Sequence, residues 1–174
     1  FILNFWIDAA DGATSVNARK YLYQTFDATL NTPQFEVYLN SGGVASAQQT
    51  LVIRQYVKDG SAFNGDFHEW QSTGFASGGG YDWKMLTLFR NSEEGDGRSG
   101  LEMYVNATAS TLSKTQTPTA ANWTGVTPSL HYVMGNRANT SNWAAAARIS
   151  DFIKWDKDIT SLSTQSSFVG SIYN

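Results

Sequence analysis

The stretch "RISDFIKWDKDIT", Arg148 to Thr160, decides how the fold of this chain is interpreted. Large apolar residues (Ile149, Phe152, Ile153 and Trp155) stand among charged ones, as in a half-buried strand. The charged residues that follow are typical of the entry to a turn, and the tail beyond them is rich in Ser and Thr. What this late strand packs against therefore determines the fold class.

The rest of the chain supplies further strand patterns separated by turn signals. In one of them Trp83, Met85 and Phe89 alternate with Leu86 and Leu88, which predicts a strand with two distinct faces. Such patterns cover residues 1–7, 20–26, 35–43, 50–57, 77–91, 101–106 and 129–136. Helical periodicity is nearly absent, apart from a short turn at 161–168, and the polar, Thr-rich segment 106–125 is interpreted as a surface loop. Many short strands with turns between them predict an all-β sandwich or barrel.

Composition narrows the class of protein. A length of 174 residues predicts a single domain, and 6 Trp, 8 Tyr and 10 Phe favour strands. A net charge of −3 without basic runs argues against nucleic-acid binding. No apolar run approaches the roughly 20 residues that span a bilayer, and the absence of Cys excludes disulfides and thiolate metal sites. Because the chain opens at Phe1, inside an apolar run, we expect a processed product or part of a longer chain.

The order of these segments resembles a known family. They are, in order, "FWI" (5–7), "FEVYLNSGG" (35–43), "YDWKMLTLFRN" (81–91), "GLEMYVNAT" (100–108), "LHYVMGN" (130–136) and "ARISDFIKWDKDIT" (147–160). Together they resemble the concanavalin A-like lectin/glucanase superfamily, in particular its laminin-G-like jelly-roll modules. The resemblance implies an antiparallel two-sheet jelly-roll sandwich over residues 1–174, with at most one short C-terminal helix. In that fold Ile149 would pack between the sheets, Trp155 would cap a sheet edge, and the helix at 161–168 would close the sandwich.

Two departures from the family pattern stand out. Family members usually have one or two strands before the "FWI" strand that pair with the last strand, and these are missing here. A segment elsewhere, or another chain, would have to supply them, since an open edge is an aggregation site. Ala107 also replaces a common Gly, which predicts a longer turn or a turn of another type.

Catalysis is not favoured by the sequence. The glucan hydrolases of this superfamily resemble one another in a Glu-x-Asp-x-x-Glu strand, and glycoside hydrolysis needs two carboxylates across the bond. The nearest match, Glu94 to Ser99, lacks the last Glu and lies in a Gly-rich turn. His68 and His131 both lie in strand patterns and are interpreted as structural or surface residues. We therefore expect no enzyme.

A calcium site is the one metal site that the resemblance implies. The acidic residues of two loops, Asp8 with Asp11 and Glu93 with Glu94 and Asp96, are the candidate ligands. Calcium takes six to eight oxygens, and neither cluster supplies that number. The interpretation that we favour is solvated acidic turns and no cofactor, with Ca²⁺ as the alternative.

A glycan site needs aromatic rings and planar amides on loops. Trp6 and Trp83 lie in strand patterns and are predicted to be core residues, and Trp70 is left open. Trp123 and Trp143 lie in polar loops, where each Trp would either stack on a sugar or fold back to pin its own loop. The candidate ligand-binding residues are Trp123, Trp143, Asn136, Arg137, Asn139 and Asn142. Asn-x-Ser/Thr acceptor sequences occur at Asn106, Asn122 and Asn139.

The sequence leaves three candidate functions. The first is a structural or adhesive module on a particle or cell surface, such as a bacteriophage capsid decoration or fibre protein, with other subunits and glycans as partners. The second is a dedicated carbohydrate-binding module of a secreted protein, and the third, disfavoured, is a glycoside hydrolase. We expect a non-catalytic jelly roll located on a virion or at the cell surface, outside membranes and without nucleic acid.

Overall fold

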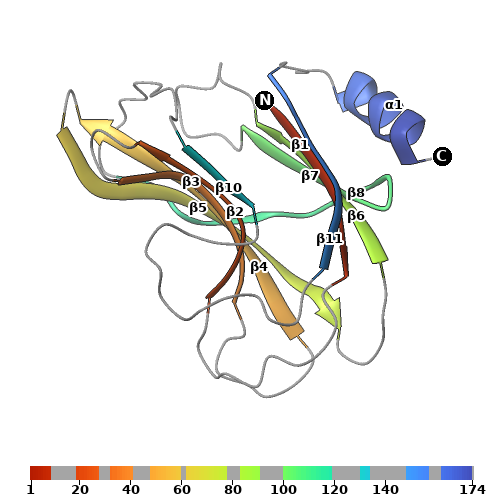
Figure 1. The fold of residues 1–174 in the computed structure, drawn as a ribbon, viewed down its shortest axis with the longest axis horizontal. Helices are drawn as coiled ribbons and strands as arrows, with labels where there is room; N and C mark the ends of the chain where they lie inside the picture. Colours follow the sequence, from red (N-terminus) through yellow and green to blue (C-terminus); the bar gives the residue numbers. More distant parts are fainter. Residues whose placement is uncertain are drawn as a thin grey trace. The chain divides into compact units, whose positions relative to one another are not determined.

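The computed structural model of the protein describes residues 1–8, 19–27, 32–40, 48–59, 62–77, 83–90, 100–118, 130–133, 148–156 and 162–173. The strands within these ranges are β1 (Ile2–Asp8), β2 (Arg19–Asp27), β3 (Thr32–Asn40), β4 (Gln48–Asp59), β5 (Ala62–Ser77), β6 (Trp83–Arg90), β7 (Leu101–Val105), β8 (Thr108–Ser110), β9 (Ser113–Gln116), β10 (Leu130–Val133) and β11 (Arg148–Trp155). The helix is α1 (Leu162–Tyr173). Figure 1 shows these elements along the chain.

The strands form two antiparallel sheets. Sheet A has the order β11-β1-β6-β7-β8, and sheet B has the order β10-β2-β3-β4-β5-β9. Sheet A with α1 forms one compact unit, and sheet B forms another. The predicted fold class is confirmed, since the chain is all-β, has two antiparallel sheets and ends in one helix. Two such sheets are what a jelly-roll sandwich is built from.

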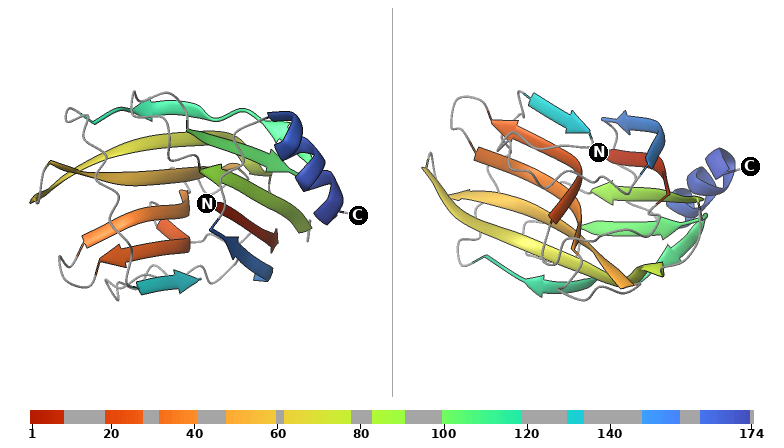
Figure 2. Two further views of the ribbon diagram at one scale, coloured as in Figure 1. Left: turned by 90° about the horizontal axis from the view of Figure 1, so that it is seen from above. Right: turned by 60° about the horizontal axis from the view of Figure 1, so that its bottom comes forward.

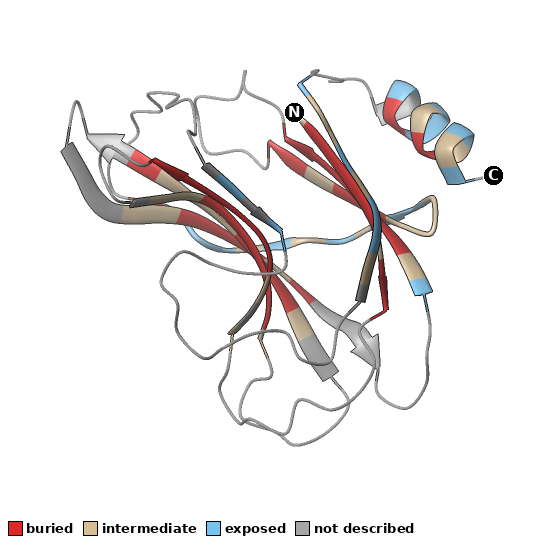
Figure 3. Ribbon diagram, viewed as in Figure 1, coloured by how far each residue is buried: buried red, intermediate tan, exposed pale blue. Residues whose placement is uncertain are grey.

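Sheet A is apolar on both faces. One face carries Leu3 and Phe5 of β1 together with Leu86 and Leu88 of β6, all fully buried. The other face carries Ile2, Phe89 and their neighbours, and α1 covers it (Figures 1 and 2). Figure 3 shows the result, with β1 and β6 buried along most of their length. This double burial explains why alternation along β6 gives two apolar faces instead of one apolar and one polar face.

The last strand, β11, contacts both its neighbour in sheet A and the helix. β11 lies at the sheet edge and pairs with β1, and its Phe152 stacks on Phe5 at 5.7 Å between ring centroids. Trp155 contacts Phe168 of α1 edge-on at 5.3 Å. The strand predicted from "RISDFIKW" is therefore confirmed. The helix is longer than expected and runs to Tyr173.

Helix α1 depends on packing for its stability. Its sequence, LSTQSSFVGSIY, is rich in Ser and contains Gly170, and it has no acidic residue in the first turn and no basic residue in the last. These are weak helix signals, and isolated helices of this length are marginal in water. Val169 is fully buried, and Phe168 and Ile172 pack beside it on sheet A. The apolar contacts with the sheet are therefore what hold the helix in place.

Replacing Gly170 with alanine should stabilise the protein. A Cβ at position 170 would meet no atom within 4 Å, so the methyl group fits without a clash. Ala is favoured over Gly in a helix interior by about 0.5–1 kcal/mol. We expect Gly170→Ala to raise the free energy of unfolding by that amount in urea titrations. Ser166→Ala, at an exposed position of the same helix, should give a smaller gain; a loss of stability in Gly170→Ala would contradict the packing described.

The hairpin between β7 and β8 turns within two residues. Asn106 and Ala107 have φ values of 49° and 61°, and Val105 pairs directly with Thr108. Two positive φ angles are typical of a type I′ turn, in which Ala is unusual. The backbone N–H of Met85 donates to Asn106 Oδ1 at 2.8 Å, and the Asn106 N–H donates to the Met85 carbonyl at 2.9 Å. The turn, expected to be longer or of another type at Ala107, is thus a tight two-residue turn, and β6 holds it.

Sheet B contains irregularities that alternation alone does not predict. The register between β2 and β3 shifts between Tyr21 and Tyr23, so that Tyr21 pairs with Tyr38 and Tyr23 pairs with Val37. Neighbours along β3 point to opposite faces, and therefore the two tyrosines of β2 do as well. Their alternation in the sequence predicts a shared face, and that prediction is wrong.

The segment 106–125, interpreted as a surface loop, is partly strand. It contains β8 and β9, which lie at sheet edges and consist mainly of polar residues. Short polar edge strands lack the apolar alternation by which strands are found in a sequence. The described residues contain no helix long and apolar enough to span a bilayer.

Candidate functional site on sheet B

A row of polar residues crosses sheet B from strand to strand. Gln24 of β2 pairs with Glu36 of β3, Glu36 pairs with Arg54 of β4, and Arg54 pairs with Glu69 of β5. Directly opposed residues share a face of the sheet, so the four side chains lie on one side. We call this side, with Tyr38, Tyr56, Phe67, Gln71 and Thr115, the polar face of sheet B.

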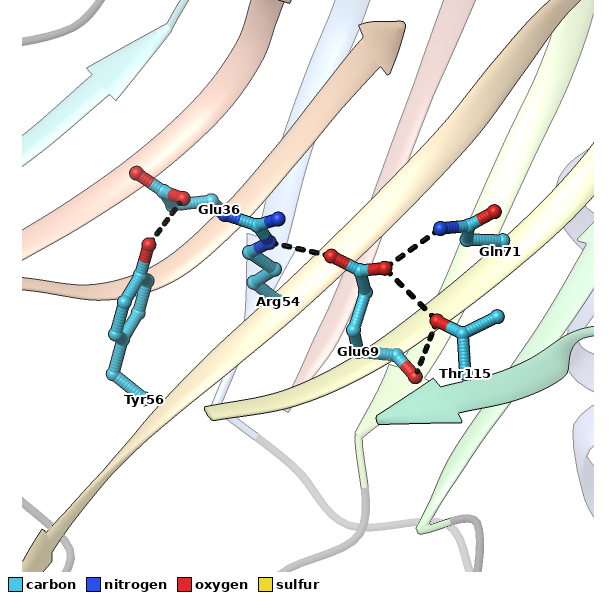
Figure 4. A network of polar contacts seen from close by, with 6 residues as sticks. All are labelled: Glu36, Arg54, Tyr56, Glu69, Gln71 and Thr115. Carbon is cyan, nitrogen blue, oxygen red and sulfur yellow. Dashed lines mark hydrogen bonds and ion pairs between the residues drawn. The ribbon is translucent and has the colours of Figure 1, made fainter. Parts of the chain in front are cut away.

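Hydrogen bonds join the polar face into two groups, one around Glu36 and one around Glu69, which are linked where Tyr56 and Arg54 interact. Glu36 accepts from Gln24 Nε2 at 2.6 Å and from the Tyr56 hydroxyl at 2.9 Å. Figure 4 shows Glu36 on one side of Arg54 and Glu69 on the other. Arg54 pairs through Nε with Glu69 Oε2 at 2.6 Å.

The second group centres on Glu69. Its Oε1 accepts from Gln71 Nε2 at 2.6 Å and from the Thr115 hydroxyl at 2.9 Å (Figure 4). With Arg54 on the other oxygen, both carboxylate oxygens have protein donors. Thr115 comes from β9, and the group therefore ties the edge strand to the centre of the sheet.

Aromatic rings lie beside the guanidinium groups. The Arg54 Cζ atom lies 4.2 Å from the centroid of the Phe67 ring and 5.5 Å from that of Tyr38. Arg19 lies on Tyr38 as well, at 5.2 Å. Tyr56 and Phe67 are tilted against each other with centroids 5.4 Å apart. Cation–π contacts of this kind hold both the rings and the arginines in place.

The two carboxylates respond oppositely to this environment. Burial raises the pKa of Glu36 above its ordinary value, and the hydrogen bonds from Tyr56 and Gln24 only partly oppose the shift. Burial acts in the same direction on Glu69. There, the hydrogen bonds from Gln71, Arg54 and Thr115 outweigh burial, and the pKa is lowered. Glu69 therefore stays ionised to lower pH, while Glu36 takes up a proton more readily.

The opposite shifts predict opposite pH effects of two matched variants. A raised folded-state pKa means that Glu36 contributes stability below its ordinary pKa, which is lost as pH rises through the raised value. The difference in the free energy of unfolding between Glu36→Gln and the wild type should therefore shift in favour of the variant as the pH is raised from 4 to 8. Glu69 behaves in reverse, because its contribution is present above its ordinary pKa and is lost on acidification.

Urea titrations of both variants at the two pH values test these effects. Glu69→Gln should be less stable than the wild type at pH 8, and the difference should shrink at pH 4. Differences that do not change with pH in either variant would contradict the assignments.

The predicted glycan residues lie outside the described ranges. This holds for Trp123, Trp143, Asn136, Arg137, Asn139 and Asn142, and also for the candidate calcium ligands Asp11, Glu93, Glu94 and Asp96. Asp8, the remaining calcium candidate, is fully buried in β1. Among the residues that are described, no group of three or more His, Asp or Glu side chains is placed to hold a metal ion.

The two histidines and the tryptophans Trp6, Trp70 and Trp83 lie within the described residues. His68 is buried and stacks on Trp70, which is buried as well, and His131 Nδ1 lies 2.8 Å from the Tyr23 hydroxyl. Trp6 is half-buried and packs against the cluster under α1, where it stacks on Tyr173. Trp83 was predicted to be a core residue, and that prediction is wrong, because it starts β6 and is 38% exposed.

The polar face itself has a weak signal in the sequence. Glu36, Arg54 and Glu69 stand in strand patterns, where charged residues usually indicate a solvated face. Only the register of β3, β4 and β5 brings them into one row. No protein-family model, curated protein or solved structure matches this chain.

Proposed function

We propose that this chain is a non-catalytic binding module of the laminin-G-like jelly-roll type, which holds a glycan on the polar face of sheet B. The observation that carries the proposal is the combination of side chains on that face. Carboxylates, a guanidinium, planar amides and aromatic rings lie together there. Ligand sites commonly combine apolar and aromatic walls with a few precisely placed polar groups.

The polar face is ordered before any ligand arrives. Tyr56 donates to Glu36, and Arg54 is fixed by Glu69 on one side and by Phe67 on the other. Side chains that are already held lose little conformational entropy when a ligand binds. This preorganisation favours recognition of a defined ligand.

Titration calorimetry with a panel of oligosaccharides tests the proposal. Phe67→Leu removes the ring that lies on Arg54 but keeps an apolar side chain, and it should weaken binding about tenfold or more. Trp123→Ala and Trp143→Ala test the loop site predicted from the sequence. Loss of binding in the two Trp variants, with Phe67→Leu unchanged, would place the site on the loops and refute the polar face.

A glycoside hydrolase is the second candidate, and one observation favours it. Glu36 and Glu69 share a face two strands apart, about 10 Å between Cα positions at ordinary strand spacing, and their pKa values are shifted in opposite directions. Such pairs serve as acid and base in glycosidases. Against it, the oxygens of both carboxylates accept hydrogen bonds from protein groups. Release of reducing sugar by the wild type that both Glu36→Gln and Glu69→Gln abolish would establish the hydrolase.

The setting that we propose is a particle or cell surface, where the module has a structural or adhesive role next to other subunits. A mildly acidic, cysteine-free composition rich in Ser, Thr and Asn suits such a place. Light scattering and electron microscopy of the native particle test it. Regular copies on a shell or fibre would support the structural role, and a free monomer would favour a dedicated carbohydrate-binding protein.

A further inference from the structure

Gln34 is the unusual residue beside the polar face. Its side-chain oxygen and nitrogen are both buried, and neither has a hydrogen-bond partner among the described residues. Buried amides in folded proteins nearly always have partners, because an unpaired buried polar group is unfavourable. The Gln34 amide therefore lacks hydrogen-bond partners that a bound molecule could supply.

The backbone at Gln34 is also irregular. Phe35 pairs with Thr25 and Pro33 pairs with Phe26, which leaves Gln34 as the extra residue of a β-bulge in β3. Bulges re-aim side chains and are common beside functional sites. Pro33 shares a face with Glu36, because their partners on β2, Phe26 and Gln24, are two residues apart, and Gln34 is the inserted residue next to Pro33. Two independent features, the unpaired amide and the bulge, thus coincide at the edge of the polar face.

We propose that the Gln34 amide is a ligand-contacting group of the polar face and that its partner is a pair of neighbouring hydroxyls of a neutral sugar. This inference rests on the proposed glycan binding. A primary amide presents an acceptor oxygen and a donor nitrogen side by side, and two vicinal hydroxyls offer a matching donor and acceptor. Gln34 is partly exposed as a whole and has three side-chain torsions, and contact with the ligand requires a rotamer change that brings the amide out of its buried position.

The charges of the polar face favour a neutral ligand. Arg54 and Glu69 compensate each other in an ion pair, Glu36 is held by Gln24 and Tyr56, and the guanidinium of Arg19, which lies on Tyr38, interacts electrostatically with Glu36. The amide of Gln34 adds a group that carries no charge. An acidic sugar would have to compete with Glu69 for Arg54, which a neutral sugar does not.

The test combines stability and affinity in one variant. Gln34→Met keeps the length of the side chain and removes both polar atoms. We expect its Tm to rise by about 3 °C, because the unpaired amide is gone. Its affinity for neutral gluco-, manno- or galacto-oligosaccharides should fall about tenfold or more. A purely structural role of Gln34 would not raise stability and lower affinity together. Gln34→Glu, which keeps an acceptor but loses the donor, should also bind more weakly.

Each other outcome overturns a specific step. A lower Tm for Gln34→Met would mean that the amide has a partner in the folded protein. Wild-type affinity in Gln34→Met, with Phe67→Leu still impaired, would refute the role of Gln34 and leave the glycan proposal intact. Binding of uronic-acid oligosaccharides alone would refute the neutral ligand. Failure of every oligosaccharide to bind the wild type would refute the glycan proposal itself.

Discussion

Phe89→Ala is expected to produce the largest loss of stability, about 3–4 kcal/mol in the free energy of unfolding. Phe89 is buried in the centre of the sheet A face that α1 covers. Its ring meets Tyr104 edge-on at 5.6 Å and Phe168 of the helix edge-on at 6.0 Å. Removing the ring opens a cavity that the paired strands β1, β6 and β7 cannot close.

The variant should also release the helix. The sequence of α1 has low helix propensity, and the helix is stabilised mainly by the contacts of Phe168 and Val169 with the sheet. We therefore expect Phe89→Ala to lose helical signal in circular dichroism and protection from hydrogen exchange in α1, before the sheet unfolds.

A matched control is available on the edge strand of the same sheet. Ile153 of β11 is 43% exposed, so Ile153→Ala should change stability by no more than about 0.5 kcal/mol. Urea titrations of both variants measure the difference. A Phe89→Ala variant that loses less than about 1 kcal/mol and keeps its helix would show that α1 is held by something other than this cluster.

Four strands of sheet A, β1, β6, β7 and β11, could be predicted because each carries its own apolar pattern, which the short edge strand β8 lacks. The alternation in β6 and β1 is local, and a strand with two apolar faces is still a strand. The buried pair Asn4 and Thr87, joined by a 2.8 Å hydrogen bond, could not be predicted. Each residue is polar in an apolar run, and the partner lies 83 positions away in the sequence.

The candidate site also depends on pairing between strands, which local sequence patterns do not reveal. Glu36, Arg54 and Glu69 are separated by hairpins, and the register of each hairpin decides which side chains meet. One bulge separates the faces of Tyr21 and Tyr23, and another singles out Gln34. A bulge depends on hydrogen bonding between two strands and leaves no local pattern in either. The sequence therefore points instead to tryptophans in polar loops, a residue type that by itself indicates ligand binding.

Arg54→Ala is expected to have the second-largest effect, a loss of about 2–3 kcal/mol at neutral pH. The side chains of Arg54 and Glu69 are only 15% and 10% exposed, so removing the guanidinium leaves a carboxylate with little access to water. Breaking a buried ion pair by removing one partner is strongly unfavourable for this reason, and partial exposure places the loss just below the usual range of about 3–5 kcal/mol. The cation–π contact with Phe67 at 4.2 Å is lost as well.

The dependence of this loss on pH and on the shape of the side chain identifies its cause. Without Arg54 the pKa of Glu69 should rise, because burial then acts against fewer hydrogen bonds. The loss measured in urea should consequently be largest near pH 7 and should shrink as the pH falls and Glu69 takes up a proton. Arg54→Lys keeps the charge but cannot place a planar guanidinium on Phe67 and a donor on Glu69 at once, so it should recover only part of the stability. A full recovery by lysine would mean that charge alone matters. A loss below about 0.5 kcal/mol in alanine would mean that solvent screens the pair, as it does for exposed salt bridges.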